Sequence, residues 1–70
     1  MQNTKRNLLK RRRKELSLTQ LDIIYYLDKN YNIKITQGYY SQIERGMRSP
    51  NLELAKSISK ILDSSINDLF

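Results

Sequence analysis

The chain has 70 residues, enough for one small domain but too few to enclose a large substrate cavity. It has no cysteine and no histidine, which excludes disulfides, thiolate chemistry, the commonest zinc ligands and the usual general base. We therefore expect a cytoplasmic protein that is not an enzyme, with no metal and no cofactor. The basic start leads into further charge, and no apolar run is long enough for a signal peptide or a membrane span.

The net charge of +6 lies entirely within residues 1–16, where seven cations accompany Glu15. A basic segment joined to a neutral body is typical of a protein that docks on a polyanion, most often nucleic acid. The alternative is a solvated helix face. A membrane-surface helix is disfavoured because Leu8, Leu9 and Leu16 are too few to bury an apolar face.

The periodicity predicts an all-α fold of about five short helices joined by polar segments. The first covers residues 3–16, with one side formed by Leu9, Arg12, Arg13 and Leu16. The second begins at the cap Thr19, with Asp22 completing a capping box. Its buried face comprises Ile23, Ile24 and Leu27. Residues 28–35 then alternate Tyr31, Ile33 and Ile35, which predicts an extended connection whose apolar side lies against the domain.

Thr36 is the predicted cap of the third helix, and Gln37 is its first helical residue. A step of about 100° per residue places Tyr40 and Ile43 on one side. The opposite side carries Gly38, Ser41, Gln42 and Arg45. Ile35 and Tyr40 form a hydrophobic staple, so Tyr40 faces inward and Tyr39 lies at the edge between the faces. Gly46 ends the helix in the left-handed conformation.

The last two helices follow a basic loop and Pro50. Asn51 caps the fourth, residues 52–62, whose core-spaced residues are Leu52, Ala55, Ile58 and Leu62. Ser65 and Asp68 repeat the capping-box pattern and start a short fifth helix that ends in Leu69 and Phe70.

The outward face of the third helix is made of glycine, serine and glutamine, without the Lys/Glu pairs that ordinarily solubilise a helix. Glutamine can bond bidentately to adenine in the major groove, and a missing side chain allows close approach to a base edge. The alternative is that these glutamines are ordinary polar surface residues.

From Leu9 to Phe70 the chain resembles the lambda-repressor-like, or XRE-type, helix-turn-helix family. The resemblance lies in "LLKRRRKELSLTQ", "ITQGYYSQIERGMRSPNLELAKSISKIL" and "SSINDLF", taken in this order. It implies a compact five-helix domain over residues 1–70, in which the second and third helices form the helix-turn-helix and the third lies in the major groove.

Position by position, the resemblance implies two sets of DNA contacts. Those that face base edges are Gln37, Gly38, Ser41 and Gln42. Those that face the phosphate backbone are Gln20, Arg13, Tyr39, Arg45, Met47 and Arg48. It also implies that Gln20 braces Gln37 and that Arg13 and Glu44 form a structural ion pair.

Four features depart from the family pattern. The 28–35 connection is longer than in the shortest members, and Ile24 replaces a small alanine, which suggests a wider helix crossing. Arg12 stands where leucine is frequent, so its stem would cover the core while its guanidinium reaches solvent or DNA. Gly38 removes a base-reading side chain, which shifts selectivity toward Gln37, Gln42 and DNA shape.

We therefore expect a sequence-specific regulator of transcription, preferably a repressor of a phage or mobile element, that binds near-palindromic double-stranded DNA as a homodimer. The Lys, Asn, Ile and Tyr usage favours an AT-rich bacterial or phage genome. A protein-interaction adaptor or antitoxin-like module on the same fold is the alternative. DNA strand transfer by Tyr39 is disfavoured because no histidine or acidic cluster would assist it. No sensor or dimerisation domain is expected after the fifth helix, so any ligand control would come from another protein.

Overall fold

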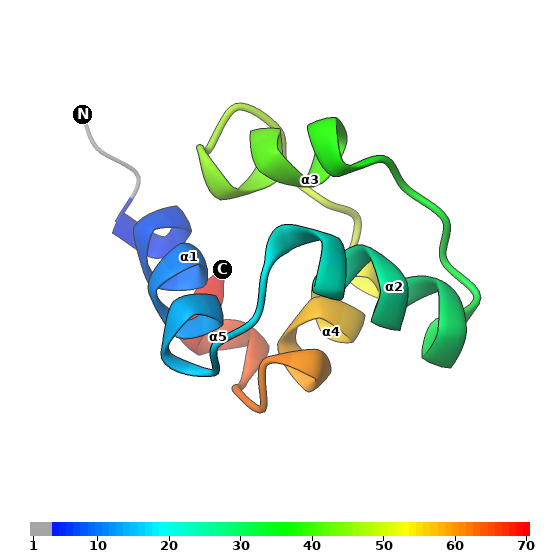
Figure 1. Ribbon diagram of the computed structural model, residues 1–70. Helices are drawn as coiled ribbons and strands as arrows, with labels where there is room; N and C mark the ends of the chain where they lie inside the picture. Colours follow the sequence, from blue (N-terminus) through cyan, green and yellow to red (C-terminus); the bar gives the residue numbers. More distant parts are fainter. Residues whose placement is uncertain (1–3) are drawn as a thin grey trace.

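The computed structural model describes residues 4–70, with side chains described from residue 8 onward. Within this range the regular structure is entirely helical, as the sequence predicts (Figure 1). The helices are α1 (Thr4–Glu15), α2 (Gln20–Tyr31), α3 (Gln37–Glu44), α4 (Leu52–Ile61) and α5 (Ile66–Leu69). The predicted start of the first helix at Asn3, and the side chains of Lys5 and Arg6, lie outside the described residues.

The four predicted caps are confirmed, because each side chain accepts a hydrogen bond from the backbone N–H three residues further on. These caps are Thr19, Thr36, Asn51 and Ser65. The capping box of α2 is complete, since Asp22 Oδ2 also accepts from the Thr19 N–H at 2.8 Å. The short polar side chains therefore satisfy backbone donors that would otherwise have no partner at each helix start.

The predicted extended connection is wrong over its first half, because α2 continues to Tyr31. Asn32 ends the helix in the left-handed conformation, with φ of 56°, and its N–H donates to the Asp28 carbonyl. Three consecutive polar residues at positions 28–30 suggest a loop, but they lie on the exposed side of α2 and leave its buried side intact. Only residues 32–36 connect the helices, and Ile33 and Ile35 pack against the core as predicted.

The core joins all five helices through a cluster of buried apolar side chains. Its members are Leu9, Ile23, Leu27, Tyr40, Ile43, Leu54, Ile58, Leu62 and Leu69. The expectation that Leu52 lies in the core is wrong, since this residue is 63% exposed. Leu54 is buried instead, because it lies four and eight residues before Ile58 and Leu62 and shares their side of α4.

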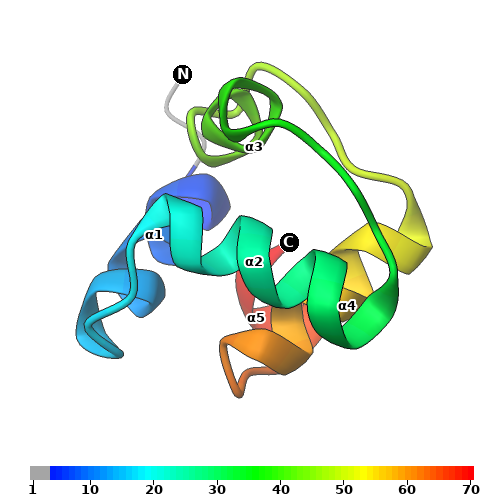
Figure 2. The ribbon, with the colours of Figure 1, turned by 45° about the vertical axis from the view of Figure 1, so that its right-hand side comes forward.

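The helix arrangement leaves one side of α3 facing away from the body of the protein. α3 packs against α1 and α2, while α4 packs against α2, and α5 packs against α1 and α4. Figures 1 and 2 show α3 at one end of the molecule, with α4 and α5 at the other. The side of α3 that does not touch α1 and α2 is therefore available to a partner.

Candidate nucleic-acid interface

The rotation of α3 about its axis agrees with the sequence prediction. Tyr40 and Ile43 are fully buried, whereas Gln37 and Gly38 are exposed. On the same outward side, Ser41 and Gln42 are half-buried. A β-carbon built at Gly38 would meet only the Thr36 hydroxyl, at 4.0 Å, so the space outside this glycine is open.

Arg13 and Glu44 form the predicted ion pair, which connects α1 to the end of α3. Arg13 Nε donates to Glu44 Oε2 at 2.6 Å, and its Nη2 donates to Oε1 at 3.2 Å. This paired geometry is the strong form of an arginine–carboxylate contact, and the hydrogen bond to Glu44 raises the pKa of Arg13. Both residues are buried, so the pair fixes α3 against the first helix.

The geometry of Arg13 argues against the phosphate contact expected for it. Its side chain is only 8% exposed, and its remaining terminal nitrogen, Nη1, donates to the Leu18 carbonyl at 2.8 Å. The guanidinium is thus engaged on all of its nitrogens within the protein. The ion pair is therefore the contact that Arg13 makes within the protein, and its phosphate contact stays a prediction.

Two glutamines extend the ion pair to the surface. Gln20 Nε2 donates to Glu44 Oε1 at 3.0 Å, and Gln37 Nε2 donates to Gln20 Oε1 at 3.3 Å. The resemblance implied that Gln20 braces Gln37, and this contact is present. The buried Glu44 carboxylate therefore positions Gln37, the first residue of α3, through the side chain of Gln20.

Tyr40 lies beneath this network as the largest fully buried side chain. Its hydroxyl is buried beside Glu44 and Arg13 without forming a hydrogen bond to any described residue. Burial, followed by the nearby Glu44 carboxylate, raises the pKa of Tyr40. The phenol therefore stays neutral in the folded protein over the physiological range.

At the other end of α3, Arg48 folds back from the following loop onto the helix. Its Nε donates to Gln42 Oε1 at 2.6 Å, and its guanidinium lies 5.5 Å from the centre of the Tyr39 ring. Sequence reasoning missed both contacts, because loop conformation determines them. Arg45 and Met47 are exposed beside Arg48, so this end of α3 presents cations and an apolar side chain to solvent.

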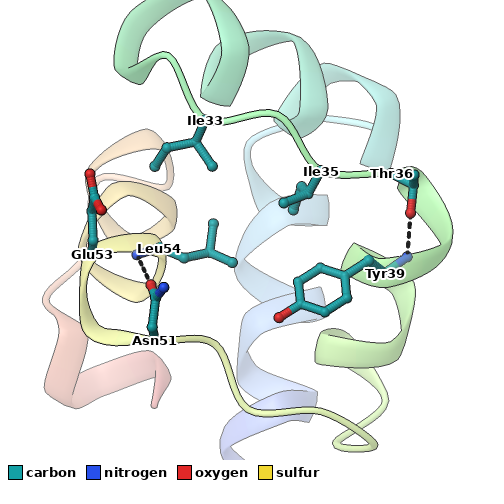
Figure 3. Close-up of a pocket in the computed structure, with 7 residues that line it drawn as sticks. All are labelled: Ile33, Ile35, Thr36, Tyr39, Asn51, Glu53 and Leu54. Atoms are coloured by element: carbon teal, nitrogen blue, oxygen red, sulfur yellow. Dashed lines mark hydrogen bonds between the residues drawn. The ribbon is translucent and has the colours of Figure 1, made fainter.

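Tyr39 lies at the edge of α3, as predicted, and its half-buried ring packs against the core cluster. Figure 3 shows the ring on one side of a cleft between α3, the 32–36 connection and the start of α4. The cleft has a volume of about 390 Å³ and is lined by Ile33, Ile35, Thr36, Tyr39, Asn51, Glu53 and Leu54. Its mostly apolar wall places the Tyr39 ring against the protein rather than outward.

Arg12 has a structural role that differs from the sequence expectation. Its Nε donates to the Leu62 carbonyl at 2.9 Å, and its Nη2 donates to the Asp63 carbonyl at 3.4 Å. These carbonyls lie at the end of α4, where acceptors lack partners within the helix and attract positive charge. Two arginines of the basic segment therefore hold the fold together. Among the side chains described from residue 8 onward, the exposed cations of this segment are Lys10, Arg11 and Lys14.

A family model for helix-turn-helix domains of the XRE type matches residues 9–69. The chain belongs to the lambda-repressor-like helix-turn-helix family. Its helix-turn-helix consists of α2 and α3, and the family is one of DNA-binding transcription regulators rather than of enzymes. Neither the curated proteins nor the solved structures gave a significant match.

Two further findings bear on what this helix-turn-helix protein can bind. Across the described part of the chain, no helix is both long and apolar enough to cross a membrane. Over the same residues, no three His, Cys, Asp or Glu side chains lie together as a metal ion would require.

Proposed function

We propose that this protein is a sequence-specific transcriptional regulator that reads the major groove of double-stranded DNA with residues 37–45. The outward face of α3 carries the proposal, since it combines an exposed, braced Gln37 with open space at Gly38. Bracing lowers the entropy lost when a side chain binds a base, and open space permits close approach. Ser41 and Gln42 complete the base-facing set.

Phosphate contacts would come from both ends of this face. The start of α2 supplies backbone N–H groups and a helix N-terminus, both of which favour a phosphate. Gln20 contributes mainly through this position, because its side chain already bonds to Glu44 and Gln37. The remaining phosphate set is Tyr39, Arg45, Met47 and Arg48. The hydrogen bonds of Gln20 to Glu44 and Gln37 thus fix the start of α2 relative to α3, so both would meet the duplex in one orientation.

Salt dependence tests the binding of nucleic acid. If each chain neutralises about four phosphates, the affinity for duplex DNA falls with salt with a log–log slope of about −4. Selection from random duplexes should also enrich one sequence. On that sequence, Gln37→Ala and Gln42→Ala should each weaken the binding free energy by about 1–3 kcal/mol, and on random DNA by much less. A flat salt response would favour the adaptor or antitoxin-like alternative. Equal losses on both duplexes would show that the glutamines do not read bases.

Two copies on a near-palindromic operator follow from the size of one recognition helix. A single α3 contacts only a few base pairs, so site choice in a genome needs two half-sites about one helical turn, or about 34 Å, apart. Sedimentation with the selected duplex should give two chains per site. One chain at saturation would contradict the paired arrangement.

We further propose repression as the sign of regulation, in a phage or mobile element. A protein bound over a promoter blocks transcription by occupying DNA, which requires nothing beyond the interface described. A reporter with the selected operator overlapping its promoter should lose transcription when the protein is expressed. Increased transcription from that reporter would indicate an activator instead.

A further inference from the structure

The cleft between α3, the 32–36 connection and the start of α4, here named the α3–α4 cleft, has apolar walls and polar ends (Figure 3). Its apolar walls include Ile33, Ile35 and Leu54, since the extended connection alternates and turns both isoleucines toward the body of the protein. Its volume of about 390 Å³ is at the small end of the range for sites that hold small molecules. The α3–α4 cleft therefore has the size and lining of a small-molecule site.

Three polar side chains at this cleft have hydrogen-bonding groups that no described residue occupies. They are the hydroxyl of Tyr39, the NH₂ group of Asn51 and the carboxylate of Glu53. The Asn51 oxygen accepts from the Leu54 N–H at 2.9 Å, so only its NH₂ group remains. Figure 3 shows the Tyr39 hydroxyl directed across the cleft toward Asn51, with Glu53 at the opposite edge from Tyr39. A ligand can bond to these groups without displacing a hydrogen bond of the protein.

The charge at the α3–α4 cleft is negative. Glu53 carries the only full charge among the lining residues. Lys34 lies in the adjacent connection, but it pairs with Asp28 at 3.1 Å and does not line the cleft. Arg48 contacts the Tyr39 ring and is likewise not a lining residue. The lining therefore complements a cation.

The two helix starts that border the cleft are occupied by their own caps. Thr36 accepts from the Tyr39 N–H at 3.1 Å, and Asn51 accepts from the Leu54 N–H. Such N–H groups would otherwise favour an anion. We propose that the α3–α4 cleft binds a small apolar or aromatic molecule that carries an ammonium group, with this group beside the Glu53 carboxylate.

Tyr39 connects the cleft to the DNA-binding face. Its hydroxyl is directed into the cleft, so the phosphate contact proposed for Tyr39 requires the hydroxyl to turn out of it. A ligand that bonds to the hydroxyl holds it inside. The ligand and DNA therefore need different positions of one group, and each weakens the binding of the other. This effect on DNA rests on the proposed function, whereas the binding of the ligand does not.

An NMR titration of the chain with tyramine tests the site in the absence of DNA. Tyramine joins a phenol ring to an ammonium group, and 3-(4-hydroxyphenyl)propionate carries a carboxylate on the same ring. For about ten heavy atoms we expect a Kd of about 0.1–1 mM for tyramine and at least about 10-fold weaker binding of the acid. The backbone amides of Ile35, Tyr39 and Leu54 should shift. No saturable shift there, or equal affinity for the two probes, would overturn the proposal.

Glu53→Gln and Glu15→Gln form a matched pair that tests the role of the carboxylate. Both variants remove one exposed negative charge, but only Glu53 lines the cleft, since Glu15 lies on α1. Glu53→Gln should weaken tyramine binding about 2- to 5-fold, and Glu15→Gln should leave it unchanged. Equal effects of the two variants would contradict the assignment of the ammonium group to Glu53.

A duplex titration at saturating tyramine tests the connection to DNA. Binding of the wild type should weaken about 5-fold, whereas the affinity of Tyr39→Phe, which lacks the shared hydroxyl, should not change. The acid at the same concentration controls for ionic strength. If tyramine binds in the cleft and leaves the duplex affinity of the wild type unchanged, the effect on DNA is refuted. If the chain binds no duplex under any condition, the proposed function fails, and the NMR titration still decides whether the cleft is a ligand site.

Discussion

Gly38 is the position where stability and DNA binding should respond in opposite directions to one added methyl group. A β-carbon there meets only the Thr36 hydroxyl, at 4.0 Å, so Gly38→Ala introduces no clash within the protein. Alanine is favoured over glycine within a helix by about 0.5–1 kcal/mol, which corresponds to an increase in Tm of roughly 2–8 °C in a domain of this size. We therefore expect a more stable protein.

The same methyl group would occupy the space that we assign to a base edge. An extra methyl group in a close-packed contact costs about 1–3 kcal/mol, so Gly38→Ala should bind the selected duplex about 5- to 150-fold more weakly. Thermal melts and binding titrations on this variant give both quantities. Gly46→Ala is the contrast, because Gly46 has φ of 77° and alanine there should lower Tm. Unchanged affinity of Gly38→Ala, or a lower Tm, would refute the reasoning.

Three further predictions concern the residues beneath and beside α3. Tyr40→Phe should match or exceed the wild type in stability at neutral pH, because it removes a buried hydroxyl without a hydrogen bond to the described residues. Because burial raises the pKa of Tyr40 in the folded protein, the unfolded chain loses the Tyr40 hydroxyl proton at a lower pH, near the ordinary tyrosine pKa of 10. The stability of the wild type relative to Tyr40→Phe should then fall by about 1.4 kcal/mol per pH unit above pH 10, as urea unfolding can measure. Tyr40→Ala should lower the free energy of unfolding by about 3–5 kcal/mol, whereas Tyr39→Ala should lower it by about 1 kcal/mol and weaken binding similarly on all duplexes. A larger loss of stability from Tyr39→Ala than from Tyr40→Ala would mean that α3 is rotated about its axis. Arg13→Met should lower the free energy of unfolding by about 3–5 kcal/mol, because it leaves Glu44 buried and unpaired. The double variant Arg13→Met with Glu44→Leu should recover most of that stability. If the losses from the two substitutions simply added, the ion pair would not be the cause.

Local chemistry explains which parts of the fold could be predicted. Each cap depends on one short polar side chain and a backbone N–H three residues away, so the sequence alone located Thr19, Thr36, Asn51 and Ser65. The helical period placed Tyr40 inward and Gln37 outward, since those directions follow from spacing once the first residue of α3 is known. The length of α2 was missed because its last turn carries polar residues on a side that happens to be exposed.

Tertiary structure decided the features that depend on contacts between distant segments. Arg12 and Arg13 are adjacent cations in the sequence, yet one binds the end of α4 and the other binds Glu44 of α3. The fold of the loop after α3 brings Arg48 back to Gln42. The sequence by itself determined that glutamines face outward from α3, because helix geometry is local. The partners of each glutamine side chain, Gln20 for Gln37 and Arg48 for Gln42, are decided only by segments brought together in three dimensions, since a hydrogen bond needs a partner of opposite kind within about 3 Å.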